Sequence, residues 1–164
     1  LPICLEEIGQ LRGSDIKQQE GIWYLHLDHA PEEGRWLKND SSRRQIPIHP
    51  KLIDLGLIKK FSGLEGKIFP LLKSAGDRQL TASWSQWFGR YLRQDIGIID
   101  KRKTFHSLRH TFKDLCRDAG VPKELHDRLT GHVSSDVGDG YGSGTYPIRP
   151  LAVAISQIQL PIEL

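Results

Sequence analysis

The segment His106-Ser107-Leu108-Arg109-His110 has the residue types and the spacing to bind a phosphate group. On a helix, positions three and four apart are neighbours, so His106, Arg109 and His110 would share one face. Arginine offers a planar fork of N–H donors to phosphate oxygens, and histidine can donate or exchange a proton near neutral pH. A zinc pair at His106 and His110 is an alternative, but the metalloprotease pattern needs Glu directly after the first His, where Ser107 stands. A basic helix exposed to solvent is a further interpretation.

Two residues farther along the chain could complete such a site. His132 follows Gly131, which is expected to end a helix, and a side chain at that point can turn into a cleft. Tyr141 lies between Gly140 and Gly142, which permit an exposed ring. Its phenol, with an ordinary pKa of about 10, becomes a useful nucleophile only where cations stabilise the phenolate. A capping histidine and a plain loop tyrosine are the structural alternatives.

Basic residues could bring these groups to a nucleic acid. The net charge of +3 is weak support, but the basic residues gather in two stretches. These are Arg35, Lys38, Arg43, Arg44 and Lys51 in the first, and Lys101, Arg102, Lys103, Arg109 and Lys113 in the second. Lys38 stands in a polar segment between two expected strands, from which a lysine can reach a DNA groove, although a solvated hairpin tip has the same composition. We expect Arg43, Arg44 and Lys103, with Ser41, to contact DNA.

The elements that must position these residues follow from periodicity and from helix start and stop signals. The pattern predicts a helix over 1–11, strands at 23–27 and 45–48 joined by exposed turns, and helices over 49–60, 84–92, 107–119, 122–131 and 148–159. Thr81 or Ser83 would cap the helix that carries Trp84, and Gly120 would end the helix that begins at Ser107. The predicted fold class is α+β, mainly helical with a small antiparallel sheet.

Length and composition fit one domain, residues 1–164, with a sizeable core. Apolar residues make up 38% of the chain and charged residues 26%, and the apolar runs are too short to span a bilayer. Two cysteines, Cys4 and Cys116, suit a reducing cytoplasmic setting. The chain has no methionine and no basic leader, so it is expected to be a fragment of a longer protein.

Taken together and in this order, the motifs resemble the tyrosine recombinase or phage integrase family, over most of the chain. The segment His106–Phe112 is close to that family's most specific box, and Gly131-His132 with Tyr141 matches its C-terminal part. Lys38, followed by Ser41 and Arg43 and then Ile46-Pro47-Ile48, is similar to its β-hairpin, and Glu7–Leu11 with Ser14–Ile16 to its first helix and strand. The resemblance implies a tyrosine-recombinase catalytic-domain fold.

The resemblance also implies a reaction. Tyr141 would attack a DNA phosphodiester and form a 3′-phosphotyrosine, so that strands are cut and rejoined without ATP. Arg109 would clamp a non-bridging oxygen, His132 would hydrogen-bond the same phosphate, Lys38 would protonate the leaving 5′-oxygen, and His106 would assist proton transfer at the tyrosine. No cofactor and no metal are implied.

The family context sets further expectations. The partners would be double-stranded DNA, a homotetramer on that DNA and an accessory DNA-bending protein, with the protein in the cytoplasm at a prokaryotic nucleoid. The family's separate N-terminal DNA-binding domain is not in this sequence. A C-terminal tail over about 145–164 would contact a neighbouring protomer.

One residue departs from the family pattern. The first arginine should stand three residues before Glu7, where this chain has Cys4, which carries no fixed charge and no donor fork. Arg12 lies over two helical turns from that position. The alternatives that stay open are a DNA-binding remnant with weakened catalysis, a type IB topoisomerase-like enzyme and a zinc hydrolase.

The other tyrosines compete with Tyr141 for the part of nucleophile. Tyr24 and Tyr91 are expected in the core, the first on a strand and the second on an apolar helix face. Tyr146 is the rival, because it lies in the same C-terminal segment, but it is five residues farther from His132 than Tyr141 is.

Overall fold

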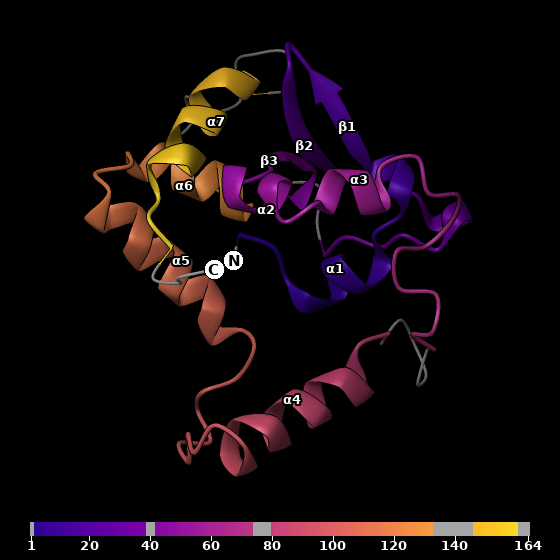
Figure 1. Ribbon diagram of the computed structural model, residues 1–164, viewed down its shortest axis with the longest axis vertical. Helices are drawn as coiled ribbons and strands as arrows, with labels where there is room; N and C mark the ends of the chain where they lie inside the picture. The colour runs from indigo at the N-terminus through magenta and orange to yellow at the C-terminus, as the bar shows by residue number, and fades with distance from the viewer. Residues whose placement is uncertain (1, 39–41, 74–79, 133–145, 161–164) are drawn as a thin grey trace.

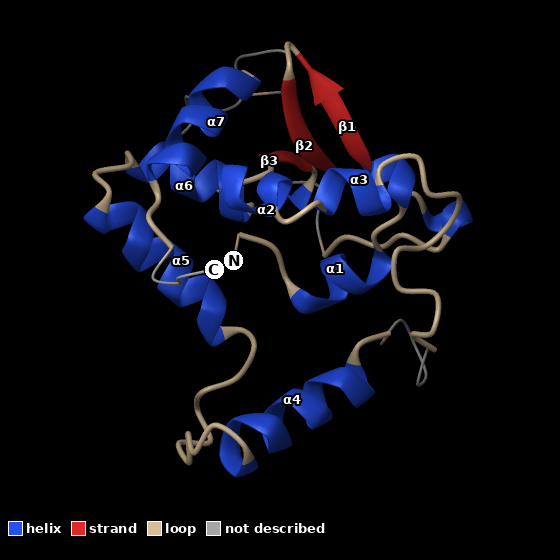
Figure 2. Ribbon diagram, viewed as in Figure 1, coloured by secondary structure: helices blue, strands red, loops and turns tan. Residues whose placement is uncertain are grey.

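The computed structural model describes residues 2–38, 42–73, 80–132 and 146–160. It contains seven α-helices within those ranges, two short 3-10 helices and a three-stranded sheet (Figures 1 and 2). The helices are α1 (Leu5–Gln10), α2 (Pro50–Asp54), α3 (Leu57–Phe61), α4 (Ala82–Gln94), α5 (Ser107–Asp118), α6 (Lys123–Thr130) and α7 (Ile148–Gln157), and the 3-10 helices are η1 (Gly13–Asp15) and η2 (Pro31–Glu33). The expected α+β class, mainly helical with a small antiparallel sheet, is confirmed.

The sheet is built from a hairpin and one returning strand. β1 (Ile16–Gln19), β2 (Ile22–Leu27) and β3 (Arg44–Pro47) pair in the order β1-β2-β3, antiparallel throughout. Glu20 and Gly21 join β1 to β2 with positive φ angles of 53° and 78°. Two consecutive residues with positive φ match the right-handed twist of the flanking strands, which is why a connection this short is possible.

The core forms where the sheet meets the C-terminal helices. Buried side chains come from the residues that flank α1 and from β2, β3, α5, α6 and α7, and Leu129, Cys116 and Ala154 are exposed by 1% or less. Figure 1 shows α7 beside β2 and β3, with α6 next to it. These elements form one packed body, on whose lower side α1 and the start of α5 lie close to the N-terminus.

α7 belongs to this core, so residues 146–160 are packed against the rest of the fold, and contact of the segment 145–164 with a neighbouring protomer stays a prediction. Its residues Ile148, Leu151, Ala154 and Ile155 are all less than 5% exposed, and Ile158 after it is 3% exposed. This apolar face is covered by the chain's own sheet, whereas Val153 on the other side of the helix is 56% exposed. Over 146–160, therefore, the segment completes the fold and is not a separate tail.

The predicted helix over 49–60 is two helices. Gly56 separates α2 from α3 with a φ of +83°, a conformation that residues with a Cβ rarely adopt. The start of α2 agrees with the sequence, because His49 is its N-cap and Pro50 its first residue, and the His49 ring accepts a hydrogen bond from the Lys51 amide.

α4 lies at the lower edge of the molecule, away from the sheet (Figure 1). Thr81 is the N-cap residue as predicted, but its hydroxyl does not cap the helix. Glu6 of α1 caps it instead. Its carboxylate accepts hydrogen bonds from the amides of Leu80 and Thr81, both 3.0 Å long, and from the Thr81 hydroxyl. A carboxylate at the N-terminus of a helix satisfies unpaired amides and the helix dipole, so Glu6 fastens α4 to α1.

The aromatic face of α4 is only partly covered. Trp84 stacks on Phe88 and meets Phe105 edge-on, with ring centroids 5.1 Å apart in both pairs. Trp87 and Tyr91 also stack on each other but are 47% and 36% exposed. The expectation that Tyr91 is a core residue was wrong, because the sheet and the C-terminal helices do not extend over this helix; Tyr24, at 7% exposure, is in the core as expected.

Candidate functional site

The phosphate-binding box predicted from the sequence lies at the start of α5. His106 is the N-cap residue of this helix, and the Ser107 hydroxyl accepts a hydrogen bond from the Thr104 amide, 3.0 Å away. The rings of His106 and His110 meet edge-on with centroids 5.4 Å apart, so the predicted common face of these two residues is confirmed. The first turn of α5 therefore presents two imidazoles and Arg109 together.

Arg109 connects this turn with the end of α6. Its Nη1 donates to the carbonyl oxygen of Pro2, 2.9 Å away, and its Nη2 donates to the carbonyl oxygen of Thr130. The side chain is half-buried, and burial is the main cause that lowers its pKa. Two of its five N–H donors are used in this way, and the other three have no acceptor among the residues that the structure describes. A half-buried guanidinium with open donors is suited to bind an anionic oxygen.

A cleft of about 270 Å³ opens beside Arg109. Its lining comes from the start of α1, from α4 and from the segment that leads into α5, namely Ile3, Cys4, Leu5, Ser85, Thr104, Phe105, His106 and Arg109. Burial, with smaller contributions from His110 and Arg109, lowers the pKa of His106 below its ordinary value of 6.5. His106 is therefore neutral at pH 7 and can accept a proton. The cleft thus brings a cation and a base together.

His132 lies at the end of α6, as the sequence predicted. Gly131 ends the helix with a φ of +66°, and the His132 amide then donates to the carbonyl oxygen of Asp127, 3.0 Å away. Burial is the first cause that lowers the pKa of His132, and Lys113 and Arg109 lower it further. Arg109 donates to the carbonyl oxygen of Thr130, two residues before His132, and lines the same cleft as His106, so it lies between the two histidines.

His132 also borders a second, open hollow of about 690 Å³ between α5 and α6. The other lining residues are mostly charged: Lys113, Arg117, Gly120, Val121, Lys123, His126 and Asp127. Asp127 is 9% exposed and binds both Lys113 and Lys123, with N–O distances of 2.9 and 2.5 Å. These two lysines are therefore held by a carboxylate, and the hollow is less basic than its composition indicates.

Three predicted site residues are not joined to this region by the structure. Tyr141 and Ser41 lie outside the described residues, so their places relative to Arg109 stay predictions. Lys38 is exposed on the connection between β2 and β3 and is not part of the cleft lining. Tyr146, the rival of Tyr141, packs against the edge of the core, with its ring 5.6 Å from the Arg128 guanidinium carbon.

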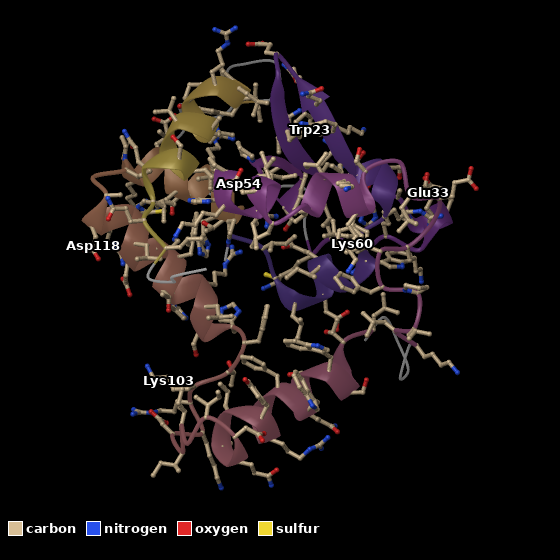
Figure 3. All side chains as sticks on the ribbon, in the orientation of Figure 1. Trp23, Glu33, Asp54, Lys60, Lys103 and Asp118 are labelled. Atoms are coloured by element: carbon tan, nitrogen blue, oxygen red, sulfur yellow. The ribbon has the colours of Figure 1, made fainter. Side chains whose placement is uncertain are left out.

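The residues expected to contact DNA differ in exposure. Arg43 is 53% exposed and pairs with Asp28 at 3.2 Å, and Lys103 is exposed on the connection between α4 and α5 (Figure 3). Arg44 is 6% exposed, which corrects the expectation that it belongs to an exposed basic cluster. Arg44 is the first residue of β3, two positions before the buried Ile46 and therefore on the same side of the strand, whereas Arg43 precedes the strand.

Arg35, from the same basic stretch, is also held inside the fold. It is 16% exposed and pairs with Asp15, which is 4% exposed, and with Glu33. The stretch over 35–51 is therefore not one solvated basic face, because both Arg35 and Arg44 use their charge in internal ion pairs.

Cys4, in the place where the family pattern has an arginine, lies at the start of α1. It is the N-cap residue, and its amide donates to the Glu7 carboxylate, 2.7 Å away. Burial first, and Glu7 second, raise the pKa of the Cys4 thiol, so it is neutral at pH 7. Cys4 thus adds no charge to the cleft that it lines.

The zinc site considered from the sequence can be compared with the positions of the histidines. Within the described part of the chain, no three His, Cys, Asp or Glu side chains gather as a metal site would require, so the pair His106 and His110 has no third ligand there. In the same part, no helix has the length and apolar character needed to cross a membrane.

Comparisons of the chain with protein-family models, with curated proteins and with solved structures find no match.

Proposed function

We propose that this chain is the catalytic domain of a tyrosine-type site-specific DNA recombinase that cuts and rejoins DNA through a 3′-phosphotyrosine. The observation that carries the proposal is the position of Arg109. Its guanidinium binds the carbonyl oxygen of Thr130, immediately before Gly131-His132, and it also lines the cleft that holds His106. Residues that are two dozen positions apart in the sequence therefore converge as a phosphate site would require.

On this proposal, the charges of the site carry out a phosphoryl transfer without a metal. The Tyr141 oxygen attacks phosphorus as neutral His106 takes the phenol proton, and the bond from phosphorus to the 5′-oxygen breaks as Lys38 supplies a proton to the leaving group. Arg109 and His132 stabilise the negative charge that spreads over the non-bridging oxygens. One phosphodiester bond is exchanged for another, so the reverse attack by a 5′-hydroxyl rejoins the strand.

The exposed basic residues would hold the DNA around this site. Arg43 and Lys103 are exposed and suited to phosphate contact, and each contact of that kind makes affinity fall as salt rises. The proposed partners are double-stranded DNA and further copies of the chain, four on each pair of recombining sites, with an accessory DNA-bending protein.

A covalent trap tests the proposal. A pool of nicked duplexes with randomised sequence around the nick would be incubated with the chain, and adducts would be separated on a denaturing gel and sequenced. The short strand beyond the nick diffuses away after cleavage and leaves the phosphotyrosine trapped. We expect an adduct that Tyr141→Phe abolishes and that Tyr146→Phe, the matched control, retains. An adduct that persists in Tyr141→Phe would refute the assignment of the nucleophile.

Cys4 supports a second candidate function, a DNA-binding remnant with little or no cleavage. Losing one transition-state cation typically costs about 100-fold to 1,000-fold in rate. A remnant would bind the duplex pool in a salt-dependent way and form no adduct. A third candidate, a type IB topoisomerase-like enzyme, would relax supercoiled DNA without site preference, whereas the proposed recombinase would give adducts enriched in one sequence.

A further inference from the structure

Two guanidinium groups bind the same carbonyl oxygen, that of Pro2, the residue before Ile3 in the cleft lining. Arg44 Nη2 of β3 lies 3.0 Å from the Pro2 oxygen, and Arg109 Nη1 of α5 lies 2.9 Å from it. The two arginines are therefore close neighbours, although 64 residues separate them in the sequence. Guanidinium N–H groups that converge on one oxygen are also suited to a phosphate oxygen, because their hydrogen bonds to phosphate are charge-assisted.

Arg44 is fixed in this position by the surrounding chain. Its Nη1 and Nη2 bind the two carboxylate oxygens of Glu7 at 3.0 and 2.9 Å, and its Nε donates to the carbonyl oxygen of Leu129 at 2.9 Å. The second donor of Nη1 binds the Ser42 carbonyl oxygen at 2.7 Å. Four of its five donors are thus used in holding the side chain, and the fifth is directed at the Pro2 oxygen.

Arg44 lies close to Cys4, the position at which the family resemblance implies an arginine. Cys4 lies next to Glu7 on α1, and its thiol is close enough to both Arg44 and Arg109 for their charges to act on it. The backbone of Gly131 passes so close to Arg44 that an added Cβ would lie 3.1 Å from Nη1. Arg44 is therefore between the position of the absent arginine and the turn that carries His132.

Arg12 is the other arginine near α1 in the sequence, but its guanidinium is directed away from Arg109. It precedes η1, and its Nη1 is directed at the carbonyl oxygen of Glu33 on η2, at 3.4 Å. The contact between Arg12 and Glu33 is exposed and lies at η2, on the connection between β2 and β3. Arg44, in contrast, binds the same Pro2 oxygen as Arg109.

We infer that Arg44 supplies the second guanidinium of the site in place of Cys4. A non-bridging oxygen of the scissile phosphate would take the position of the Pro2 carbonyl oxygen, where Arg44 Nη2 and Arg109 Nη1 both reach it. Glu7 neutralises the charge of Arg44, so Arg44 contributes an oriented N–H donor and Arg109 contributes the net positive charge. This inference rests on the proposed recombinase function and names the residue that restores part of its catalysis.

A double-mutant cycle tests it. Arg44→Lys keeps a positive charge beside Glu7 but removes the fork, and it would be made both in the natural chain and in Cys4→Arg. The rate of adduct formation would be measured on the nicked-duplex pool at saturating DNA. We expect Arg44→Lys to lower that rate by about 100-fold in the natural chain and by less than about 5-fold in Cys4→Arg, where the new arginine holds the phosphate.

Equal losses in the two backgrounds would overturn the inference, because an arginine that only stabilises the fold would be needed equally in both. That outcome leaves the proposed function intact, since adducts still form. If neither the natural chain nor Cys4→Arg forms an adduct, the proposed function fails and the inference fails with it. Thermal unfolding of each variant would show that it is folded at the assay temperature.

If Arg44→Lys does not unfold cooperatively, and is therefore not folded, a second variant tests the inference. Glu7→Gln keeps the shape of the side chain but leaves the charge of Arg44 unneutralised beside the phosphate. For a phosphate-binding Arg44, the adduct rate should rise about 3-fold to 10-fold, because a charged donor stabilises the transition state more than a neutral pair does. An unchanged or lower rate in a folded Glu7→Gln variant would count against the inference.

Discussion

Replacing Asp127 by Asn should lower the free energy of unfolding by about 2 kcal/mol at pH 7. The carboxylate is 9% exposed and lies between Lys113 and Lys123. Burial opposes its ionisation, but hydrogen bonds from Lys123 and Lys113 outweigh burial and lower its pKa from 3.8 to about 2. Each pKa unit corresponds to about 1.4 kcal/mol between the folded and unfolded states, which gives the stated magnitude.

The pH dependence of this effect has a definite sign. Because the folded-state pKa is below the unfolded value, the unfolded chain binds the proton first as pH falls. The stabilisation is fully present above about pH 4 and is lost as pH falls to about 2. The difference in unfolding free energy between the natural chain and Asp127→Asn should therefore be constant from pH 7 to pH 5 and decrease below pH 4.

Urea unfolding followed by tryptophan fluorescence, at several pH values from 2 to 7, measures this difference. Asp114→Asn is the matched control, because Asp114 pairs with Arg117 on the exposed side of α5, where both side chains are more than 60% exposed. Such a pair contributes little, so that variant should unfold like the natural chain. A difference for Asp127→Asn below about 0.5 kcal/mol at pH 7, or one that is the same at pH 2, would refute the reasoning.

Three more outcomes follow from the structure. Gly131→Ala should cost about 1–2 kcal/mol, because its φ is +66° and the new Cβ would lie 3.1 Å from Arg44 Nη1; an unchanged melting temperature would contradict this. Burial raises the pKa of Cys116 to about 11, so at pH 8 a thiol reagent should label Cys4 well before Cys116, and equal labelling rates in the folded chain would exclude that difference. Lys38→Ala should slow cleavage of a normal phosphodiester by about 100-fold or more. It should slow cleavage of a 5′-bridging phosphorothiolate little, because a thiolate leaves without a proton. Equal slowing of both substrates would argue against Lys38 as the acid.

The sequence predicted those parts of the fold that depend on local signals. The start of α5 at Ser107, the end of α6 at Gly131 and the pairing of β2 with β3 agree with the structure, because spacing, capping and glycine conformation act over a few residues. The positions of His106 and Arg109 at the start of α5 and of His132 after α6 also follow from local signals, whereas their common role in one site stays a prediction.

The features that the sequence did not predict depend on contacts between distant segments. The capping of α4 by Glu6 joins residues 75 positions apart, and the ion pair of Arg44 with Glu7 joins residues 37 positions apart. The inward position of Arg44 was not predicted, because a run of basic residues favours contact with DNA and local spacing does not show which arginine pairs with Glu7. The exposure of Tyr91 could not be predicted, because an amphipathic pattern does not show how far its covering layer extends.

The first turn of α1 is a junction between separate parts of the fold. Glu6 holds the start of α4, and Glu7 holds both Arg44 and the Cys4 amide. A change of side chain at Cys4 would therefore leave both carboxylate contacts in place, whereas a change at Glu6 or Glu7 would loosen α4 or Arg44. On the proposed function, the charge of the cleft can thus vary through one position without a change in the contacts that hold the fold together.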